Sequence, residues 1–216
     1  TPFDPDLRIS REQIHADLGA LAKITDCVRL YSVNQGLEQV PEVAREVGIQ
    51  VLLGAWIGYD RDMNAAELDR AIGLANANTD VVRALIVGNE VLLRRERSED
   101  EMRALIREAR ARAKVPVTYA DVWEFWTRHD SLAQEVDFVT VHILPFWEDE
   151  PVDIADALEH VAATRRHVGE HFAGKHVLIG ETGWPSQGRQ RRLRLPGGKA
   201  GSSTSCRRRS FSAGAR

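Results

Sequence analysis

With 216 residues, of which 43% are hydrophobic and 28% are charged, the chain has the length and composition of one globular domain with a sizeable core. Its formal net charge of −3 averages two unlike parts, because residues 189–216 hold eight Arg, one Lys and no acidic residue, which leaves residues 1–188 at about −12. A strongly acidic body disfavours nucleic acid as a partner and is compatible with a neutral substrate.

Six short apolar runs predict β-strands, and helical patterns separate them. The runs lack a clean alternation of polar and apolar residues, which is typical of parallel strands that are buried on both faces. In chain order, the expected strands are Val28–Ser32, Val51–Ile57, Arg83–Glu90, Pro116–Val122, Phe138–Leu144 and His176–Glu181.

Amphipathic helices are expected between these strands. Three of them begin with the pattern of a capping box, in which the first side chain caps the helix and the residue three positions later caps it in return. The pairs are Ser10 with Gln13, Asn64 with Glu67, and Ser98 with Glu101, and two further helices are expected over Gln35–Val47 and Val152–Phe172. Connections of this kind are nearly always right-handed.

The regular alternation of strands and helices predicts the α/β class and a (β/α)8 barrel of the TIM type. Six strands are two short of a closed barrel, and the segment before Asp6 resembles a loop that leaves an earlier strand. We therefore expect residues 1–188 to form an incomplete barrel domain that lacks the first and eighth strands. Such a barrel would have two unpaired sheet edges, which favour association or instability.

Residues 189–216 form a separate basic segment that is rich in Arg, Gly and Ser. Its only large apolar residues are Leu193, Leu195 and Phe211, too few to build a packed core. Two interpretations stay open. The segment is either a disordered, solvated tail or a stretch outside the native reading frame.

Two glutamates each stand where a strand-like run ends, Glu90 after Ala84–Asn89 and Glu181 after Val177–Gly180. A carboxylate at the end of a buried strand is costly to desolvate unless something uses it. Because the C-terminal strand ends of a parallel barrel converge on one face, the pair predicts a shared acid/base site. The alternative is that each glutamate caps the helix that follows or pairs with a nearby Arg.

Val87–Glu90 and Ile179–Ser186 resemble the two signature segments of the family-seventeen glycoside hydrolases, which are β-1,3-glucanases and glucanosyltransferases on a (β/α)8 barrel. Val139–Trp147 and Arg29–Tyr31 fit the same family pattern, and the likeness extends over residues 1–190. It is nearer to the bacterial branch of the family than to the plant branch.

The resemblance implies a retaining double displacement with Glu90 as general acid/base and Glu181 as nucleophile. The two carboxyl groups would then lie about 5–5.5 Å apart, and a separation far above about 10 Å would exclude this account. We expect the neighbouring negative charge and partial burial to raise the pKa of Glu90. Asn89 would hydrogen-bond the sugar 2-hydroxyl, while Leu144 stands where many plant relatives carry Tyr, so that polar contact would be absent.

All five tryptophans fall at or just beyond expected strand ends, where flat rings suit the apolar faces of glucose units. Ordinary packing is the alternative for each ring, and we expect it for Trp126, one helical turn after Trp123. Tyr31 is expected to contact the nucleophile or substrate hydroxyls rather than the core. His142 either bonds the substrate or is a satisfied core histidine. The expected substrate-binding residues are Tyr31, Trp56, Asn89, Trp123, His142, Trp147 and Trp184.

No metal or cofactor is expected. The sequence His167-Val168-Gly169-Glu170-His171 matches a metalloprotease pattern, but it lies near the end of an expected helix and has no obvious third ligand. We interpret its histidines as exposed residues favoured near a helix C-terminus. Glycine-rich phosphate-binding motifs are absent, and Cys27 and Cys206 imply no disulfide framework.

The favoured hypothesis is thus an enzyme that hydrolyses or transfers β-1,3-glucan. The alternative is an inactive fragment that binds glucan or nothing, and a metalloprotease is the weakest option. No signal peptide is found, and no run approaches the roughly 18 apolar residues of a membrane span. Since the sequence starts at Thr1, an export signal or a membrane anchor of a larger parent protein would not be visible. The compartment is undetermined, although the resemblance implies the periplasm or cell envelope.

Overall fold

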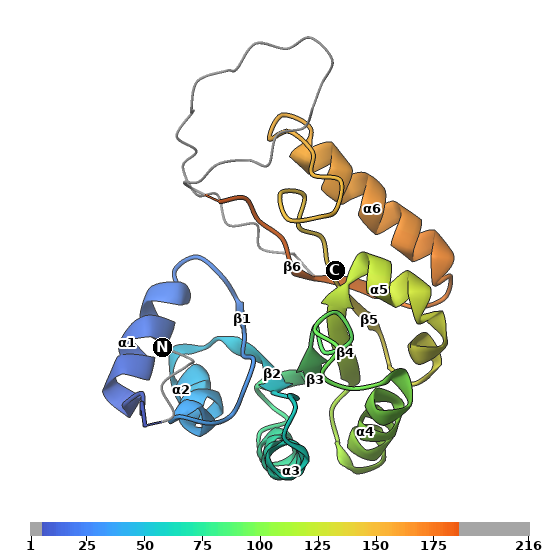
Figure 1. Ribbon diagram of the computed structural model, residues 1–216. Helices are drawn as coiled ribbons and strands as arrows, with labels where there is room; N and C mark the ends of the chain where they lie inside the picture. Colours follow the sequence, from blue (N-terminus) through green and yellow to red (C-terminus); the bar gives the residue numbers. More distant parts are fainter. Residues whose placement is uncertain (1–5, 186–216) are drawn as a thin grey trace.

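The computed structural model of this protein describes residues 6–185. Within them, six parallel strands form one sheet whose order follows the chain, and this sheet curls into part of a barrel (Figure 1). The strands are β1 (Cys27–Arg29), β2 (Gln50–Ala55), β3 (Val82–Asn89), β4 (Val117–Val122), β5 (Val139–His142) and β6 (Val177–Glu181). The prediction of an incomplete TIM-type barrel is confirmed. The predicted basic tail, residues 189–216, lies outside the described residues.

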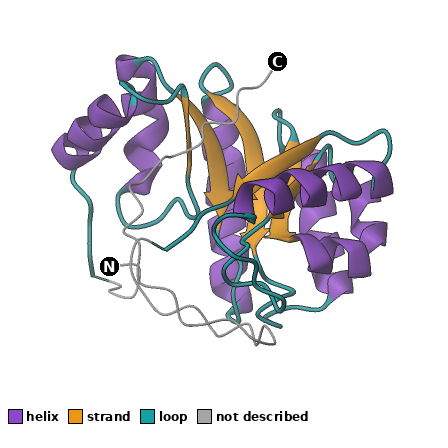
Figure 2. Cartoon of the chain, turned by 90° about the horizontal axis from the view of Figure 1, so that it is seen from above, coloured by secondary structure: helices purple, strands orange, loops and turns teal. Residues whose placement is uncertain are grey.

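Helices connect the strands and cover the outer side of the curved sheet (Figures 1 and 2). They pack on the strands that they connect, as α3 does on β2 and β3. The α-helices are α1 (Arg11–Leu21), α2 (Val40–Val47), α3 (Arg61–Ala77), α4 (Glu99–Arg112), α5 (Trp123–Arg128) and α6 (Ala157–His171), and two 3-10 helices span Leu37–Gln39 and Asp130–Gln134. None of the helices in residues 6–185 has the length and apolar character that crossing a bilayer requires.

The predicted helix starts have different outcomes. Ser98 and Glu101 form the complete capping box at the start of α4, as the sequence pattern indicates. Ser10 caps α1 by accepting a hydrogen bond from the backbone N–H of Gln13, but the Gln13 side chain donates to Asp17 instead of closing the box. The prediction of a capping box at Asn64 and Glu67 is wrong.

Asp60, and not Asn64, caps α3. The Asp60 side chain accepts a hydrogen bond from the backbone N–H of Met63 at 2.9 Å. Asn64 and Glu67 lie one turn later, inside the helix and buried, with 5% and 3% of their surface exposed. Their polar side chains therefore bond partners inside the protein and do not cap the helix.

The central strands are buried on both faces, which explains their apolar sequences. In β3, every residue except Arg83 is buried, and the Leu85 and Val87 side chains have no exposed surface. Complete burial of such a side chain stabilises the fold by about 1.5–3 kcal/mol. Since all six strands run in the same direction, their C-terminal ends lie at one edge of the sheet. The polar residues that close the strands meet there.

Candidate active site

The structure brings the two strand-end glutamates together. One carboxylate oxygen of Glu90, one of Glu181 and a ring nitrogen of His142 all lie within 4.8 Å of one another. Glu90 follows β3, His142 ends β5 and Glu181 ends β6, so the parallel sheet supplies all three side chains at its C-terminal edge. Their separation lies far inside the limit of about 10 Å that would have excluded a glycosidase site.

The turn after β3 sets the direction of the Glu90 side chain. Gly88 has φ of 82° and Glu90 has φ of 52°, both in the left-handed region. A Cβ on Gly88 would lie 2.8 Å from Cγ2 of Val91, so a larger residue there would disturb the turn. A non-glycine residue with positive φ is uncommon and costs about 1–3 kcal/mol, which the surrounding structure must offset.

A second glycine allows close packing beneath Glu181. A Cβ on Gly180 would lie 2.6 Å from Cγ2 of Thr140, 3.0 Å from Nη1 of Arg29 and 3.2 Å from the His142 ring. The missing side chain makes room for the arginine and the histidine below the end of β6. This explains the Gly-Glu order in the second motif.

Arg29, at the end of β1, connects the polar groups of three other strands. Its Nη1 donates to the backbone oxygen of Gly180 at 3.0 Å and lies 3.3 Å from Oε1 of Glu181. Its Nη2 donates to Oδ1 of Asn89 at 2.6 Å. The guanidinium also lies 4.5 Å from the centre of the Tyr31 ring. Arg29 lies in one of the segments that resemble the family pattern, but it was not predicted as a site residue.

His142 lies buried between the two glutamates, with no exposed side-chain surface. Its Nδ1 is 2.8 Å from Oε1 of Glu90, and its Nε2 is 3.1 Å from Nη1 of Arg29. Because a guanidinium can only donate, Nε2 is the acceptor, and a neutral imidazole carries its proton on Nδ1, facing Glu90. Both nitrogens are thus engaged by the protein, which favours the alternative of a satisfied histidine over a direct bond to substrate.

The pKa of Glu90 is lowered, contrary to the expected rise. The hydrogen bond from His142 is the main cause, and the positive charges of Arg94 and Arg29 add to it. Burial acts in the opposite direction but is the smaller effect. The expectation was wrong because it considered the neighbouring carboxylate and partial burial without the His142 hydrogen bond and the arginines that the fold brings to the same place.

Tyr31 and Asn89 lie beside the two glutamates, as expected. The Tyr31 hydroxyl donates to Oε1 of Glu181 at 2.9 Å, and burial raises the pKa of Tyr31 to about 12. This hydroxyl therefore keeps its proton and stays a donor at physiological pH. Since Asn89 Oδ1 accepts from Arg29, any hydrogen bond from Asn89 to a sugar would come from Nδ2.

A third carboxyl group lies near the site and was not predicted as a site residue. Asp121, on β4, is completely buried and accepts hydrogen bonds from the Tyr119 hydroxyl and from the backbone N–H of Val122. Burial raises the pKa of Asp121 from 3.8 to about 6. Tyr119 in turn accepts from the backbone N–H of Leu92 at 3.0 Å, which anchors the turn that carries Glu90.

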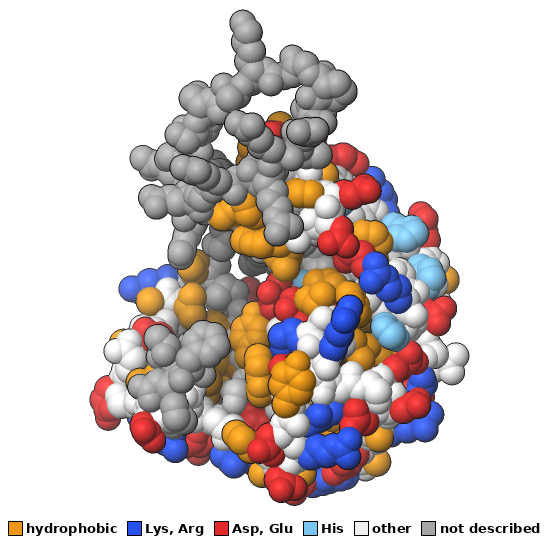
Figure 3. Space-filling model, in the orientation of Figure 1, with side chains coloured by type: hydrophobic (Ala, Val, Ile, Leu, Met, Phe, Trp, Pro, Cys, Tyr) orange, Lys and Arg blue, Asp and Glu red, His pale blue; other side chains and the backbone are white. Residues whose placement is uncertain are grey.

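A cleft of about 490 Å³ opens in front of the glutamates. Figure 3 shows acidic side chains in a hollow on this face, with hydrophobic side chains around them. The cleft is lined by both glutamates and by side chains that include Leu93, Phe125, Trp147 and Glu148. Burial also raises the pKa of Glu124, another lining residue. The lining thus combines apolar rings with carboxyl groups.

Among the five tryptophans, all within the described residues, Trp147 is the one that lines the cleft. Trp147 lines the cleft and is 56% exposed, and both it and Trp184 pack edge-on against Phe146. Trp56 is 41% exposed, with the Arg94 guanidinium 4.8 Å from its ring centre.

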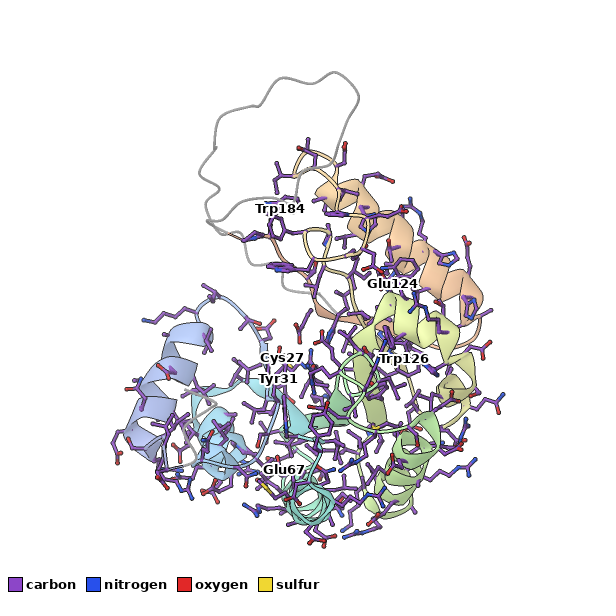
Figure 4. All side chains as sticks on the ribbon, viewed as in Figure 1. Cys27, Tyr31, Glu67, Glu124, Trp126 and Trp184 are labelled. Carbon is purple, nitrogen blue, oxygen red and sulfur yellow. The ribbon has the colours of Figure 1, made fainter. Side chains whose placement is uncertain are left out.

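The other two tryptophans pack against neighbouring side chains, Trp126 fully buried and Trp123 half-buried. Trp123 packs edge-on against His167 of α6 and does not line the cleft, which favours packing over the predicted sugar contact. Trp126 is buried and donates to the backbone oxygen of Thr140, so it is a packing residue, as expected (Figure 4).

The cluster of Glu90, His142 and Glu181 has ligand atoms close enough together to hold a metal ion. However, the Arg29 guanidinium already bonds His142 and Glu181 from the same side. The fixed positive charge of Arg29 would repel a divalent cation there, so the donor set does not suit a metal. His167 and His171 of the metalloprotease pattern lie on α6, where His167 packs against Trp123.

The profile of the BtgE/BtgC glycoside hydrolase domain matches residues 1–207 of the chain. A glucan 1,3-beta-glucosidase of Schizosaccharomyces pombe is 28% identical over 194 residues, which cover 80% of this chain and 59% of that protein. A protein of the same name from Arthroderma benhamiae is 29% identical over 154 residues, 67% of this chain and 50% of that protein. The chain therefore spans little more than half the length of these relatives. Both are fungal, and the resemblance to the bacterial branch stays a prediction.

Solved structures agree with this match. A glycoside hydrolase family 17 beta-1,3-glucanosyltransferase from Rhizomucor miehei has a TM-score of 0.73 at 27% identity, over 85% of this chain and 69% of that chain. An active-site mutant of the beta-1,3-glucanosyltransferase of the same organism, in complex with laminaritriose, has a TM-score of 0.76 at 26% identity, over 88% and 71%. A beta-D-glucuronidase of Dictyoglomus thermophilum, at 17% identity and a TM-score of 0.64 over 81% of this chain and 33% of that chain, shares the fold alone.

Proposed function

This chain belongs to the BtgE/BtgC glycoside hydrolase family, and on that basis we propose that it cleaves β-1,3-glucan with retention of configuration, using Glu90 as acid/base and Glu181 as nucleophile. The observation that carries the proposal is the approach of the two carboxylates to within 4.8 Å. Retaining enzymes hold their two carboxyl groups about 5–5.5 Å apart, whereas inverting enzymes need about 6.5–9.5 Å to admit a water molecule.

In the first step, a Glu181 oxygen attacks the anomeric carbon, the glycosidic C–O bond breaks, and the leaving oxygen takes a proton from Glu90. Tyr31 and Arg29 both hydrogen-bond Oε1 of Glu181, so we assign the attack to Oε2. Likewise, His142 engages Oε1 of Glu90, and we assign the transferred proton to Oε2. Fixed hydrogen bonds of this kind orient the reacting atoms before the substrate arrives.

In the second step, Glu90 accepts a proton from the incoming hydroxyl, whose oxygen bonds the anomeric carbon and releases Glu181. If the incoming hydroxyl belongs to water, the product is hydrolysed glucan. If it belongs to another sugar, the glucan is transferred and lengthened. Analysis of laminarin oligosaccharide products for chains longer than the substrate separates these two outcomes.

Aromatic side chains supply the surface for the sugar rings. Trp147 is exposed in the cleft, and Trp184 packs on the same Phe146 ring beside it. We propose that these two rings, with Trp56 on the other side of Glu90, stack on the apolar faces of glucose units. Asn89 would donate through Nδ2 to the sugar 2-hydroxyl.

One observation favours a second candidate, a domain that binds glucan without cleaving it. The lowered pKa of Glu90 means that this carboxyl group holds no proton at neutral pH in the ligand-free chain. A general acid in that state cannot protonate the leaving oxygen. The two candidates differ in outcome, since an enzyme consumes laminarin at acidic pH, whereas a binding domain is stabilised by laminarin and leaves it intact at every pH.

Azide rescue tests the roles of the two glutamates separately. Glu181→Gly and Glu90→Gly are each incubated with azide and a dinitrophenyl β-laminarioligoside, whose leaving group needs no acid. In the first variant, azide replaces the nucleophile and gives the α-glycosyl azide. In the second, azide attacks the glycosyl–enzyme and gives the β-glycosyl azide. Exchanged anomers, or full activity of either variant without azide, would overturn the assignment, and Glu135→Gln serves as the control.

A further inference from the structure

Glu67 is a buried carboxylate that the chemistry described above does not use. It lies on α3, outside the curved sheet, and only 3% of its surface is exposed (Figure 4). A carboxylate in such a place is costly unless hydrogen bonds satisfy its oxygens. Glu67 receives four of them.

Three donors meet at one oxygen of Glu67. The Ser32 hydroxyl donates to Oε1 at 2.7 Å, the backbone N–H of Val33 at 2.9 Å and the backbone N–H of Trp56 at 3.2 Å. The other oxygen, Oε2, accepts from the side-chain amide of Asn34. All of these donors belong to segments at the C-terminal edge of the sheet.

The donors come from two segments that are far apart in the sequence. Residues 32–34 follow directly after Tyr31, which donates to Glu181, while Trp56 follows β2 and carries the Arg94 guanidinium on its ring. A single carboxylate therefore fixes the backbone of both segments, which follow the neighbouring strands β1 and β2, at once.

We propose that Glu67 is a positioning residue, which holds Tyr31 against Glu181 and Trp56 against the substrate by tying their two segments together. The proposal rests on the proposed function of the cleft, since it assigns Tyr31 and Trp56 a part in that function. Glu67 itself touches neither the substrate nor the reacting atoms.

The amide analogue cannot replace this carboxylate. In Glu67→Gln, the amide oxygen can take the Oε1 position and keep the three donors there. The NH2 group then takes the Oε2 position, where it faces the NH2 group of Asn34, and both groups are donors. Rotating the Asn34 amide does not relieve this conflict, because Asn34 Oδ1 accepts from Arg70 at 2.5 Å and the NH2 group would then face the guanidinium. Glu67→Gln should therefore break the link while preserving the size of the side chain.

Hydrogen exchange tests the link without reference to activity. In full-length Glu67→Gln, the amides of both segments, around residues 32–34 and 56–58, should exchange faster than in the wild type. Glu135→Gln, at a buried glutamate that bonds Arg103 and Arg107, is the matched control and should leave both segments unchanged. Faster exchange in one segment alone, or in neither, would overturn the proposal. If Glu67→Gln does not fold, Ser32→Ala, which removes one donor, is measured in its place under the same criteria.

Kinetics on laminarin then test the effect on the site. We expect Glu67→Gln to lower kcat/KM by at least about tenfold, the cost of one or two hydrogen bonds to a charged group. Because Glu67 acts through Tyr31, Tyr31→Phe should cost at least about threefold less in the Glu67→Gln background than in the wild type. Fully additive effects would overturn the proposal. An inactive wild type, by contrast, would contradict the proposed function and leave the exchange result to decide on the link.

Discussion

At the scale of single residues, one arginine contacts both the glutamate at the end of β6 and the asparagine beside Glu90. Arg29 bonds Glu181 and Asn89 directly, and its charge also lowers the pKa of Glu90. Hydrogen bonds to charged groups are worth about 1.5–3 kcal/mol each, so this side chain contributes to both stability and chemistry. The lowered pKa of Glu90 comes mainly from the His142 hydrogen bond, to which the charges of Arg94 and Arg29 add.

The pH dependence of activity should follow the protonation of Glu90. The acid must be protonated at the first step, so kcat/KM should fall as pH rises through the lowered pKa of Glu90. Arg94→Gln removes a cation 3.8 Å from Oε2 of Glu90, which should raise this pKa and move the fall in activity to higher pH. Profiles of kcat/KM against pH measure the shift.

The control is Arg97→Gln, whose guanidinium donates to the backbone oxygens of Glu96 and Tyr59 and not to Glu90. Its pH profile should overlay that of the wild type. A shift in the opposite direction for Arg94→Gln would contradict the role given to its charge.

Asp121 should make stability depend on pH. Its pKa in the folded protein is about 6, above the ordinary value of 3.8, so the folded state binds its proton more tightly than the unfolded chain does. The stabilisation from that proton is complete below about pH 4 and is lost as pH rises through 6, a change of about 3 kcal/mol. Asp121→Asn cannot titrate. Its free energy of unfolding relative to the wild type should therefore rise by about 3 kcal/mol between pH 4 and pH 7. A constant difference in urea unfolding across this range would refute the assignment.

Individual residues were predictable where a local signal existed. Glu90 and Glu181 each close an apolar run, with Asn89 directly before Glu90, and that position predicts the edge of the sheet where they meet. His142 is followed by Ile143 and Leu144 within its run, and it was predicted from the family resemblance instead. Asp121 carries nearly the same signal but is followed by Val122, which continues the run and hides the end of the strand. The direction of the Glu90 pKa shift depends on His142, 52 positions away, and no local pattern contains that information.

At the scale of elements, the strands were predicted closely and the helix starts less well. Parallel strands buried on both faces leave continuous apolar runs, and the observed bounds differ from the expected ones by a few residues at most. The pattern at Asn64 and Glu67 matched a capping box only by chance, because Asp60 offers the same chemistry one turn earlier. The short helix α5 was not predicted as an element, although Trp126 was expected to pack one helical turn after Trp123.

The complete capping box of α4 should be worth more than the single cap of α1. Ser98→Ala removes the bond from the backbone N–H of Glu101 to the Ser98 hydroxyl. The Glu101 side chain, which accepts from the backbone N–H of residue 98, then loses the arrangement that holds it in place. We expect a loss of about 1–2 kcal/mol, against about 0.5–1 kcal/mol for Ser10→Ala. Urea unfolding of the two variants gives both numbers. An equal or smaller loss for Ser98→Ala would show that the Glu101 bond contributes nothing.

At the scale of the whole molecule, the cleft collects groups from four neighbouring strands and, through Arg29, from the far edge of the sheet. Its residues follow β3, β4, β5 and β6, and Arg29 reaches it from β1 at the other side of the sheet. Within residues 6–185, β1 and β6 each pair with a single neighbouring strand. Contacts across the cleft therefore connect strands that form no backbone hydrogen bonds with each other.

A bound glucan should add to this cohesion. A ligand present at 100 times its dissociation constant stabilises the folded state by about 2.7 kcal/mol. For a protein of this size, this should raise the Tm by several degrees, about 2–4 °C per kcal/mol. Thermal scans with laminaripentaose measure the effect, and maltopentaose, with α-1,4 linkages, is the control. Equal shifts with both sugars would contradict a specific β-1,3-glucan site.

The bond between Arg29 and Glu181 joins positions that are 152 residues apart. Contacts of such long range form only after the intervening chain has been organised, because closing a long loop costs entropy before the contact repays it. During refolding, helices and adjacent strand pairs should consequently regain their spectroscopic signals before catalysis returns. Recovery of the proposed turnover would then report the last assembly event of residues 6–185, the moment at which β1 and β6 meet.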